Sequence, residues 1–168
     1  MSRNPTEGSR SRMITVLVAR PTDSGSHEFL RLRRAVTEFH AGTWQTIRGG
    51  VETGETATLA ALRELKEEAG LTPVEFYRLG TVETFYLDAD ERIWQSPAFF
   101  ALVDRTAAVT LDHEHDSHKW IPRERIVAET MWASERALIN DLFIDILDNG
   151  PAKSYLRIHL EHPPKTTG

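Results

Sequence analysis

The sequence GGVETGETATLAALRELKEEAGL, residues 49–71, holds the strongest structural signal of the chain. Thr56 or Thr58 can cap the first turn of a helix, and Gly70 can adopt the left-handed conformation that ends one. We therefore predict a helix over residues 56–69. The apolar residues that share one face of this helix at about 100° per residue, and should meet the core, are Leu59, Leu62, Leu65 and Ala69.

Three glutamates, Glu64, Glu67 and Glu68, fall on nearly the opposite face. Glu64 and Glu68 are one turn apart, and like charges at this spacing destabilise a helix by about 0.2–0.5 kcal/mol. Arg63 can neutralise only part of the charge. One interpretation is a solvated face, the usual meaning of such charge patterns. The other is a site for divalent cations, which prefer clustered oxygen ligands.

The fixed positions of the stretch favour the cation site. Gly49, Glu55, Arg63-Glu64-Leu65, Glu67-Glu68 and Gly70-Leu71 fit the pattern G-x5-E-x7-R-E-U-x-E-E-x-G-U, where U is apolar. This pattern resembles the complete Nudix box, and the flanking strands resemble that family over residues 13–147. The resemblance implies an α+β fold, the Nudix α/β/α sandwich with a mixed β-sheet. It also implies hydrolysis of nucleoside diphosphates linked to a further group.

The resemblance also assigns roles to residues. Glu64, Glu67 and Glu68 would bind Mg²⁺ or Mn²⁺ together with a backbone carbonyl at Gly49 or Arg48. Among the catalytic residues, Glu55 and Arg63 would support the site, because a guanidinium can fork onto a carboxylate and fix its rotamer.

The general base stays open between Glu67, Glu68 and Glu114. Glu114 precedes Trp120 by six residues, an offset at which several family members place a glutamate. A solvated loop acid is the alternative for Glu114. Spacing alone also permits zinc at the three histidines beside it, His113, His115 and His118, but histidines in loops are usually exposed, so we do not expect zinc.

Two segments bear on the substrate. Residues 43–56 and 131–139 resemble the subgroup of dATP pyrophosphohydrolases and dihydroneopterin triphosphate pyrophosphatases. The residues that carry this resemblance are Trp44, Gln45, Trp132, Ser134 and Arg136. Trp44 can stack on a base or belong to the core, and we favour the core. Arginines 31, 33 and 34 alternate along a strand, where surface positions are common, although one of them could meet phosphate.

Other segments complete the expected domain. Strands are predicted over 13–19, 28–34, 44–47, 75–87, 96–104, 119–122 and 155–160, with the first two forming a hairpin. The segment 75–87 is either one strand or two strands broken at Gly80. A polar loop is expected over 112–118, a short helix over 122–130 and a longer helix over 132–147. We assign residues 1–12 to a disordered arm, 13–160 to the Nudix domain and 161–168 to a flexible tail.

Composition excludes several classes of function. The chain of 168 residues has no cysteine, so disulfides and thiolate chemistry are ruled out, and a reducing cytoplasm is expected. Its net charge of −5 argues against a broad nucleic-acid surface. The apolar run at 13–19 is too short to span a membrane. A homodimer is left open.

We therefore expect an enzyme, a Mg²⁺-dependent pyrophosphohydrolase that cleaves a small nucleoside or pterin triphosphate to a monophosphate and pyrophosphate. Hydrolysis of ADP-ribose, a dinucleoside polyphosphate or capped RNA is the alternative within the same class. A nucleotide-binding module without catalysis is the alternative from another class, although such modules usually lose box glutamates.

Overall fold

The computed structural model describes residues 12–89 and 91–160. The N-terminal half contains β1 (Met13–Pro21), β2 (His27–Arg34), β3 (Trp44–Gln45), β4 (Ile47–Gly50), α1 (Ala57–Ala69) and β5 (Pro73–Leu87). The C-terminal half contains β6 (Arg92–Val103), β7 (His115–Pro122), α2 (Arg123–Glu129), α3 (Ala133–Leu142), the π-helical turn η1 (Phe143–Leu147), α4 (Lys153–Leu156) and β8 (Arg157–Ile158). The predicted arm and tail lie outside the described residues, except for Arg12.

The strands form a mixed sheet in the order β3-β2-β1-β6-β5-β8, with β4 added to β1 and β7 added to β2. β1 runs parallel to β6, and the other pairs are antiparallel. Met13 to Val16 pair with β4, whereas Ala19 to Pro21 pair with β2. Because β1 changes partner midway, β4 and β2 diverge at this point.

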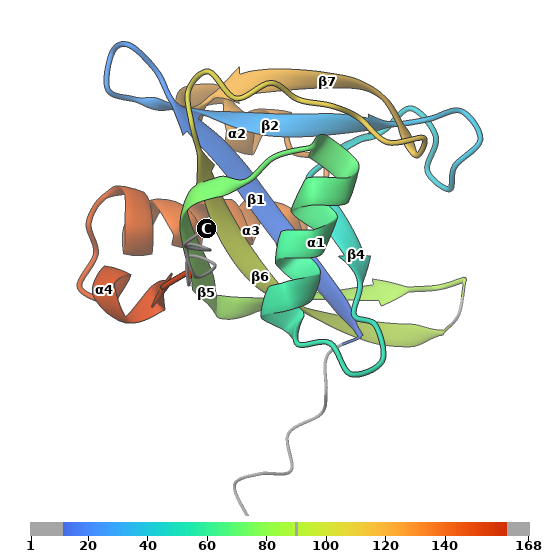
Figure 1. Ribbon diagram of the computed structural model, residues 1–168. Coiled ribbons are helices and arrows are strands. Elements are labelled where there is room, and N and C mark those ends of the chain that lie inside the picture. The colour runs from blue at the N-terminus through green and yellow to red at the C-terminus, as the bar shows by residue number, and fades with distance from the viewer. Residues whose placement is uncertain (1–11, 90, 161–168) are drawn as a thin grey trace, which may run out of the picture.

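Helices cover both faces of the sheet (Figure 1). Ile14, Val16 and Val18 of β1 pack towards α1, whereas Leu17 and Ala19 pack in the second core with α3. This alternation along one strand separates the two cores. The α+β sandwich with a mixed sheet is therefore confirmed.

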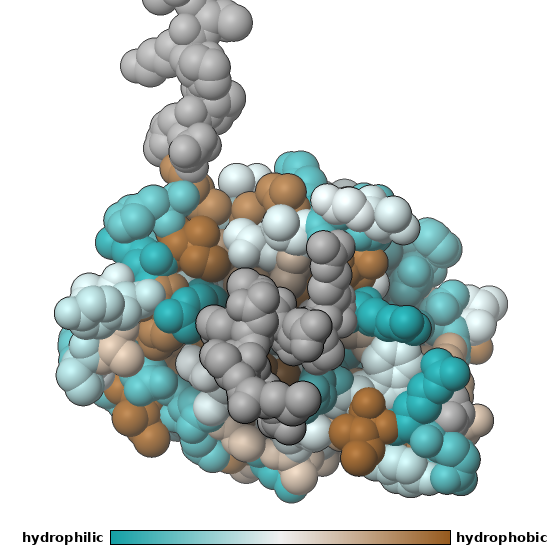
Figure 2. Space-filling model, turned by 90° about the horizontal axis from the view of Figure 1, so that it is seen from below, coloured by the Kyte–Doolittle hydropathy of each residue, from teal (hydrophilic) through white to brown (hydrophobic). Residues whose placement is uncertain are grey.

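Hydrophobic residues on the face seen in Figure 2 lie in separate small groups among hydrophilic ones.

In the part of the chain that the structure describes, no helix combines the length and the apolar character needed to cross a membrane.

The predicted core face of α1 is partly wrong. Leu59 is 56% exposed and Leu62 is half-buried, whereas Glu68 is 4% exposed. The residues of α1 that are buried are Ala60, Ala61, Leu65, Glu68 and Ala69. The small alanines let the helix lie close to the sheet, and this rotates Glu68 towards β7 rather than towards solvent.

Two other expectations are corrected. β7 begins at His115, so the polar loop predicted to 118 ends earlier, because main-chain pairing with β2 decides this segment despite its polar composition. The last predicted strand, 155–160, is shorter than expected: residues 155 and 156 belong to α4, and only Arg157–Ile158 pair with β5. The helix expected over 132–147 is formed by α3 and, directly after it, η1, so the segment is helical from Ala133 onward but its last residues form a π-helix.

Candidate functional site

The ends of α1 agree with the signals in the sequence. Thr56 is the N-cap, and its hydroxyl accepts a hydrogen bond from the Leu59 amide at 3.2 Å. Gly70 ends the helix at φ 70°. Fixed ends hold the helix in register, so that its glutamates meet defined partners in β4 and in the turn before β7.

Arg63 organises the exposed side of the site. Its Nε and Nη2 donate to the two carboxylate oxygens of Glu55, both at 3.0 Å. Nη1 donates to Glu64 at 2.7 Å and Glu67 at 3.0 Å, and Nη2 also donates to the Gly50 carbonyl at 2.8 Å. Hydrogen bonds from Arg63 and the Glu52 amide lower the pKa of Glu55. Arg63 thus ties the loop before α1 to the glutamates of the helix, and Glu67 keeps 56% side-chain exposure.

Gly49 and Glu64 lie in very close contact. A Cβ placed on Gly49 would lie 2.0 Å from Cδ of Glu64 and 2.2 Å from its Oε1. With Glu64 in this position, a side chain at residue 49 would displace the carboxylate. The arrangement brings the Glu64 carboxylate against the main chain of β4, which contains Arg48 and Gly49, the residues whose carbonyl groups were predicted as metal ligands.

Glu68 is the buried member of the set. Burial, followed by the charges of Glu64, Asp112 and Glu114, raises the pKa of Glu68 to about 9, while Arg34 opposes the shift. Its Oε2 is buried and has no hydrogen-bond partner among the described residues. Burial also raises the pKa of Glu64. The carboxylates therefore converge on a region where negative charge is poorly compensated.

Glu114 reaches this region from the turn before β7. Its Oε2 accepts a hydrogen bond from Nη1 of Arg34 at 2.6 Å, and its charge raises the pKa of both Glu64 and Glu68. The side chain is 40% exposed. Glu114 is thus held beside the site by Arg34 and is not merely a solvated loop acid.

His115 and Asp112 are neighbours that the sequence did not predict. Nδ1 of His115 lies 2.9 Å from Oδ1 of Asp112, and Nε2 lies 3.8 Å from Oε2 of Glu68. The side chain of His115 is fully buried. The sequence shows His115 directly after Glu114. Spacing along the chain does not tell which face of the strand is covered, so the burial of His115 could not be predicted.

The donor set fits a hard divalent cation. Carboxylate and carbonyl oxygens are the ligands that Mg²⁺ and Mn²⁺ prefer. The burial and the raised pKa of Glu68 indicate a place where positive charge would be stabilising. In the described side-chain positions, no three acidic or histidine side chains surround a common point, since Arg63 draws Glu64 and Glu67 towards itself. Histidines 113, 115 and 118 likewise form no metal-binding group within residues 12–89 and 91–160.

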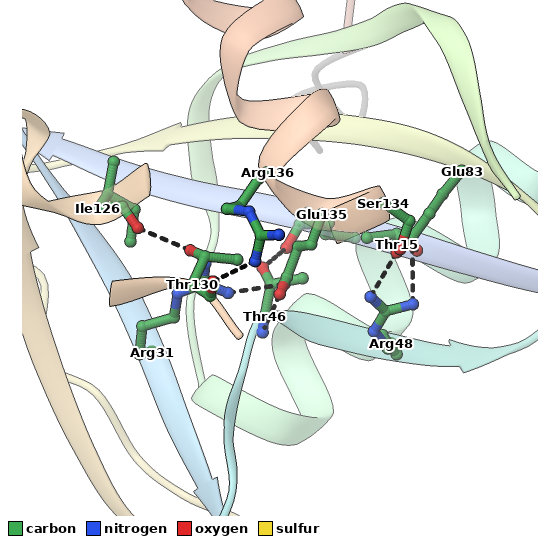
Figure 3. Close-up of polar contacts among 11 residues, drawn as sticks. Thr15, Arg31, Thr46, Arg48, Glu83, Ile126, Thr130, Ser134, Glu135 and Arg136 are labelled. Carbon is green, nitrogen blue, oxygen red and sulfur yellow. Dashed lines mark hydrogen bonds and ion pairs between the residues drawn. The ribbon is translucent and has the colours of Figure 1, made fainter. Parts of the chain in front are cut away.

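A second polar cluster lies on the opposite face of the sheet, beneath α3 (Figure 3). Arg48 donates to both oxygens of Glu83 at 2.7 Å, while Ser134 and Thr15 donate to the same carboxylate at 2.7 and 2.8 Å. Burial favours the neutral acid, but Arg48 and the hydroxyls outweigh it and lower the pKa of Glu83. Ser134 was among the residues singled out in the sequence, whereas Glu83 was not. No residue near Glu83 in the chain indicates that Glu83 binds Arg48 and Ser134.

A buried ion pair lies beside this cluster, where β2 and β4 diverge. Arg31 donates to Oε1 of Glu135 at 2.6 Å and also contacts Thr130. The same oxygen of Glu135 accepts the Thr46 amide at 3.2 Å. Arg31 is 2% exposed, so the expectation of a surface position is wrong for this residue.

Aromatic rings gather near the start of α3. The ring of His40 lies 4.0 Å from that of Phe39 and 5.6 Å from that of Trp132, between centroids. Phe39 is 63% exposed. Trp44 is half-buried on β3, with Lys119 and Arg33 over its ring, so it is neither fully core nor free. Arg136 donates to the carbonyls of Thr130 and Met131 and so fixes the loop before Trp132.

Comparisons with known proteins identify the family and several relatives of the chain. A family model described as "NUDIX domain" matches residues 11–142. The dihydroneopterin triphosphate diphosphatase of Escherichia coli K12 is 29% identical over 148 residues, covering 80% of this chain and 94% of that protein. The oxidized purine nucleoside triphosphate hydrolase of Danio rerio is 29% identical over 97 residues, covering 58% of this chain and 60% of that protein. The structure of a C. elegans Ap4A hydrolase binary complex matches with a TM-score of 0.66 at 25% identity, over 79% of this chain and 95% of that one.

Proposed function

Because the chain belongs to the Nudix family of hydrolases, we propose that it is a Mg²⁺- or Mn²⁺-dependent pyrophosphohydrolase. Its substrate would be a nucleoside or pterin triphosphate, and its products a monophosphate and pyrophosphate. The observation that carries the proposal is the Glu64 carboxylate packed against Gly49, together with the buried Glu68, whose pKa of about 9 is raised partly by the charges of Glu64 and Glu114.

Glu64, Glu67, Glu68 and the Gly49 carbonyl would hold the cation. A bound cation would screen the charge of the diphosphate and make water more acidic. Arg63 keeps Glu64 and Glu67 on one side of α1 and would exchange part of these contacts for the cation. Glu55 holds the guanidinium from the other side, through two hydrogen bonds.

Glu114 is our choice for the general base. Arg34 binds Oε2 of Glu114, so we assign the role of proton acceptor to Oε1. The partly exposed carboxylate can reach water, whereas Glu68 is buried. A hydrogen bond from Arg34 also fixes the rotamer, which general-base catalysis requires. Glu67 and Glu68 stay the alternatives for this role.

The aromatic cluster supports a substrate with a planar ring. Phe39 and Trp132 present ring surface from two loops, with His40 between them. Arg34 links this cluster to the catalytic region, because its side chain contacts both the Phe39 carbonyl at 3.4 Å and Glu114 at 2.6 Å. Stacking of a purine or pterin on such rings contributes to binding and tolerates different bases. The E. coli relative, named for a pterin triphosphate, agrees with this assignment.

Hydrolysis of a dinucleoside polyphosphate is the second candidate, favoured by the structural similarity to the Ap4A hydrolase of C. elegans. Binding without catalysis is less supported, since every glutamate of the box is present. Hydrolysis of ADP-ribose or capped RNA stays an alternative within the same class. A homodimer, the cytoplasmic location and the exact domain limits stay predictions from the sequence.

The test is a product analysis on four substrates with Mg²⁺: dATP, dihydroneopterin triphosphate, diadenosine tetraphosphate and ADP-ribose. Pyrophosphate release from one of the first two, lost in Glu68→Gln, is the expected result. Release of ATP and AMP from diadenosine tetraphosphate, with no cleavage of the triphosphates, would favour the second candidate. Nucleotide binding without turnover of any substrate would refute the enzymatic proposal.

A further inference from the structure

Three side chains form a line from the turn before β7 to α1, and the last two of them, His115 and Glu68, are buried. His115 lies in the middle, 2.9 Å from Asp112 through Nδ1 and 3.8 Å from Glu68 through Nε2. Oδ1 of Asp112 also accepts the backbone amide of Glu114 at 3.1 Å. Since this oxygen acts as an acceptor, the Nδ1 position of His115 is the one that carries a hydrogen. The other ring nitrogen, Nε2, is thereby directed at Glu68.

The two atoms that face each other in this line have no other partner. Nε2 of His115 and Oε2 of Glu68 are both buried, and neither has a hydrogen-bond partner in the described part of the chain. Buried polar atoms without partners are uncommon and destabilising. Their separation of 3.8 Å exceeds hydrogen-bond length by roughly half an ångström. A hydrogen donated from Nε2 to Oε2 would satisfy both atoms and would leave Glu68 as a carboxylate that can bind a cation.

The main chain fixes this arrangement from two directions. The Thr110 amide donates to the Ala69 carbonyl at 2.9 Å, so the segment that leads to Asp112 is bound to the last turn of α1. On the other side, His115 pairs in register with Arg34 of β2. Figure 1 shows this end of α1 next to β2 and the loop that enters β7. The ring is therefore held against Glu68 by two independent backbone contacts.

We propose that His115 is a positioning residue for Glu68, held in turn by Asp112. By engaging Oε2 of Glu68, the ring would orient the carboxylate and leave Oε1 available to a cation. The inference rests on the proposed function, in which Glu68 is a metal ligand. His115 itself touches neither cation nor substrate. Groups that hydrogen-bond to metal ligands typically change metal affinity or activity by about 10- to 100-fold when they are removed.

The test compares two substitutions of similar polarity. His115→Asn keeps a polar atom near Nδ1 and the contact with Asp112, but nothing that reaches Glu68. His115→Gln places its amide near the former Nε2 and can still donate to Glu68. Mn²⁺ affinity, measured by electron paramagnetic resonance of the free ion, should fall about 10- to 100-fold in His115→Asn and stay close to wild type in His115→Gln. Turnover number should follow the same order, with KM little changed at saturating cation.

Two controls make the result decisive. His118→Asn, at an exposed position on the same strand, should leave Mn²⁺ affinity unchanged. If His115→Asn does not fold, as judged by its melting curve, Asp112→Ala removes the group that orients the ring and should weaken Mn²⁺ binding. Equal affinities in the Asn and Gln variants would overturn the positioning role while leaving the proposed function intact. Absence of Mn²⁺ binding and hydrolysis in the wild-type chain would overturn both.

Discussion

Replacement of Gly49 by alanine tests the geometry of the site with the addition of a single carbon. The new Cβ would lie 2.0 Å from Cδ of Glu64. Non-bonded carbons need about 3.5 Å, so the Glu64 carboxylate must retreat by about 1.5 Å. The clash falls on the end of a flexible side chain rather than on the backbone, so the carboxylate can move without disturbing β4.

The expected result is loss of activity in a stable protein. Gly49 does not have a positive φ, so alanine fits the backbone and gains about 0.4–1 kcal/mol through the unfolded state. Loss of the partly exposed contact between Arg63 and Glu64 costs about 0–1 kcal/mol. The two effects nearly cancel. Displacing a ligand by more than 1 Å, however, should lower the turnover number about 100-fold.

The assay is the initial rate of pyrophosphate release at saturating Mg²⁺, with urea unfolding measured in parallel. Gly50→Ala is the matched control, since its Cβ would meet its nearest neighbour, the Arg12 carbonyl, at 3.9 Å. A wild-type rate in Gly49→Ala, or an equal loss in Gly50→Ala, would refute the idea that the close approach of Glu64 matters.

Three further outcomes are expected. Glu67→Gln should reduce the rate at least 100-fold with an unchanged melting temperature, because Glu67 is exposed and contacts Arg63 rather than the core; circular dichroism and kinetics check this. Glu83→Gln leaves Arg48 with a lost charge partner and should destabilise the fold by about 3 kcal/mol at pH 7. The folded-state pKa of Glu83 lies below its unfolded value. The contribution of ionised Glu83 to the free energy of unfolding is therefore complete above about pH 4.5 and is lost as the pH falls through the folded pKa. Urea unfolding between about pH 3 and 7 should accordingly show a smaller stability difference between wild type and Glu83→Gln at the acidic end. Trp132→Ala should raise KM for a purine or pterin triphosphate about tenfold and leave that for inorganic tripolyphosphate unchanged, which steady-state kinetics would reveal.

The sequence predicted the parts of the fold that local chemistry determines. The caps at Thr56 and Gly70, and the continuous apolar run of β1, are signals within a few residues, and all agree with the structure. The family assignment also followed from fixed positions within one helix and its loop. These features need no knowledge of distant contacts.

The errors share a cause in packing between distant segments. Three glutamates on one helix look equivalent in a projection, yet Glu67 is exposed and Glu68 is buried under the segment that enters β7. The strand character of 115–118 depends on β2, some 80 residues earlier. Arg31 was expected at the surface because its partner, Glu135, lies more than 100 residues away. Side chains acquire such partners only through the topology.

The parallel pairing of β1 with β6 has a consequence for biosynthesis. Thr15 lies opposite Ala98, so the first strand waits for 83 further residues before its central neighbour exists. At about 5–20 residues per second, this delay is on the order of ten seconds on the ribosome. During that time, the apolar run of β1 can pair with β2 but has an uncovered edge. We therefore expect the nascent N-terminal hairpin to be prone to pairing with other chains until β6 emerges.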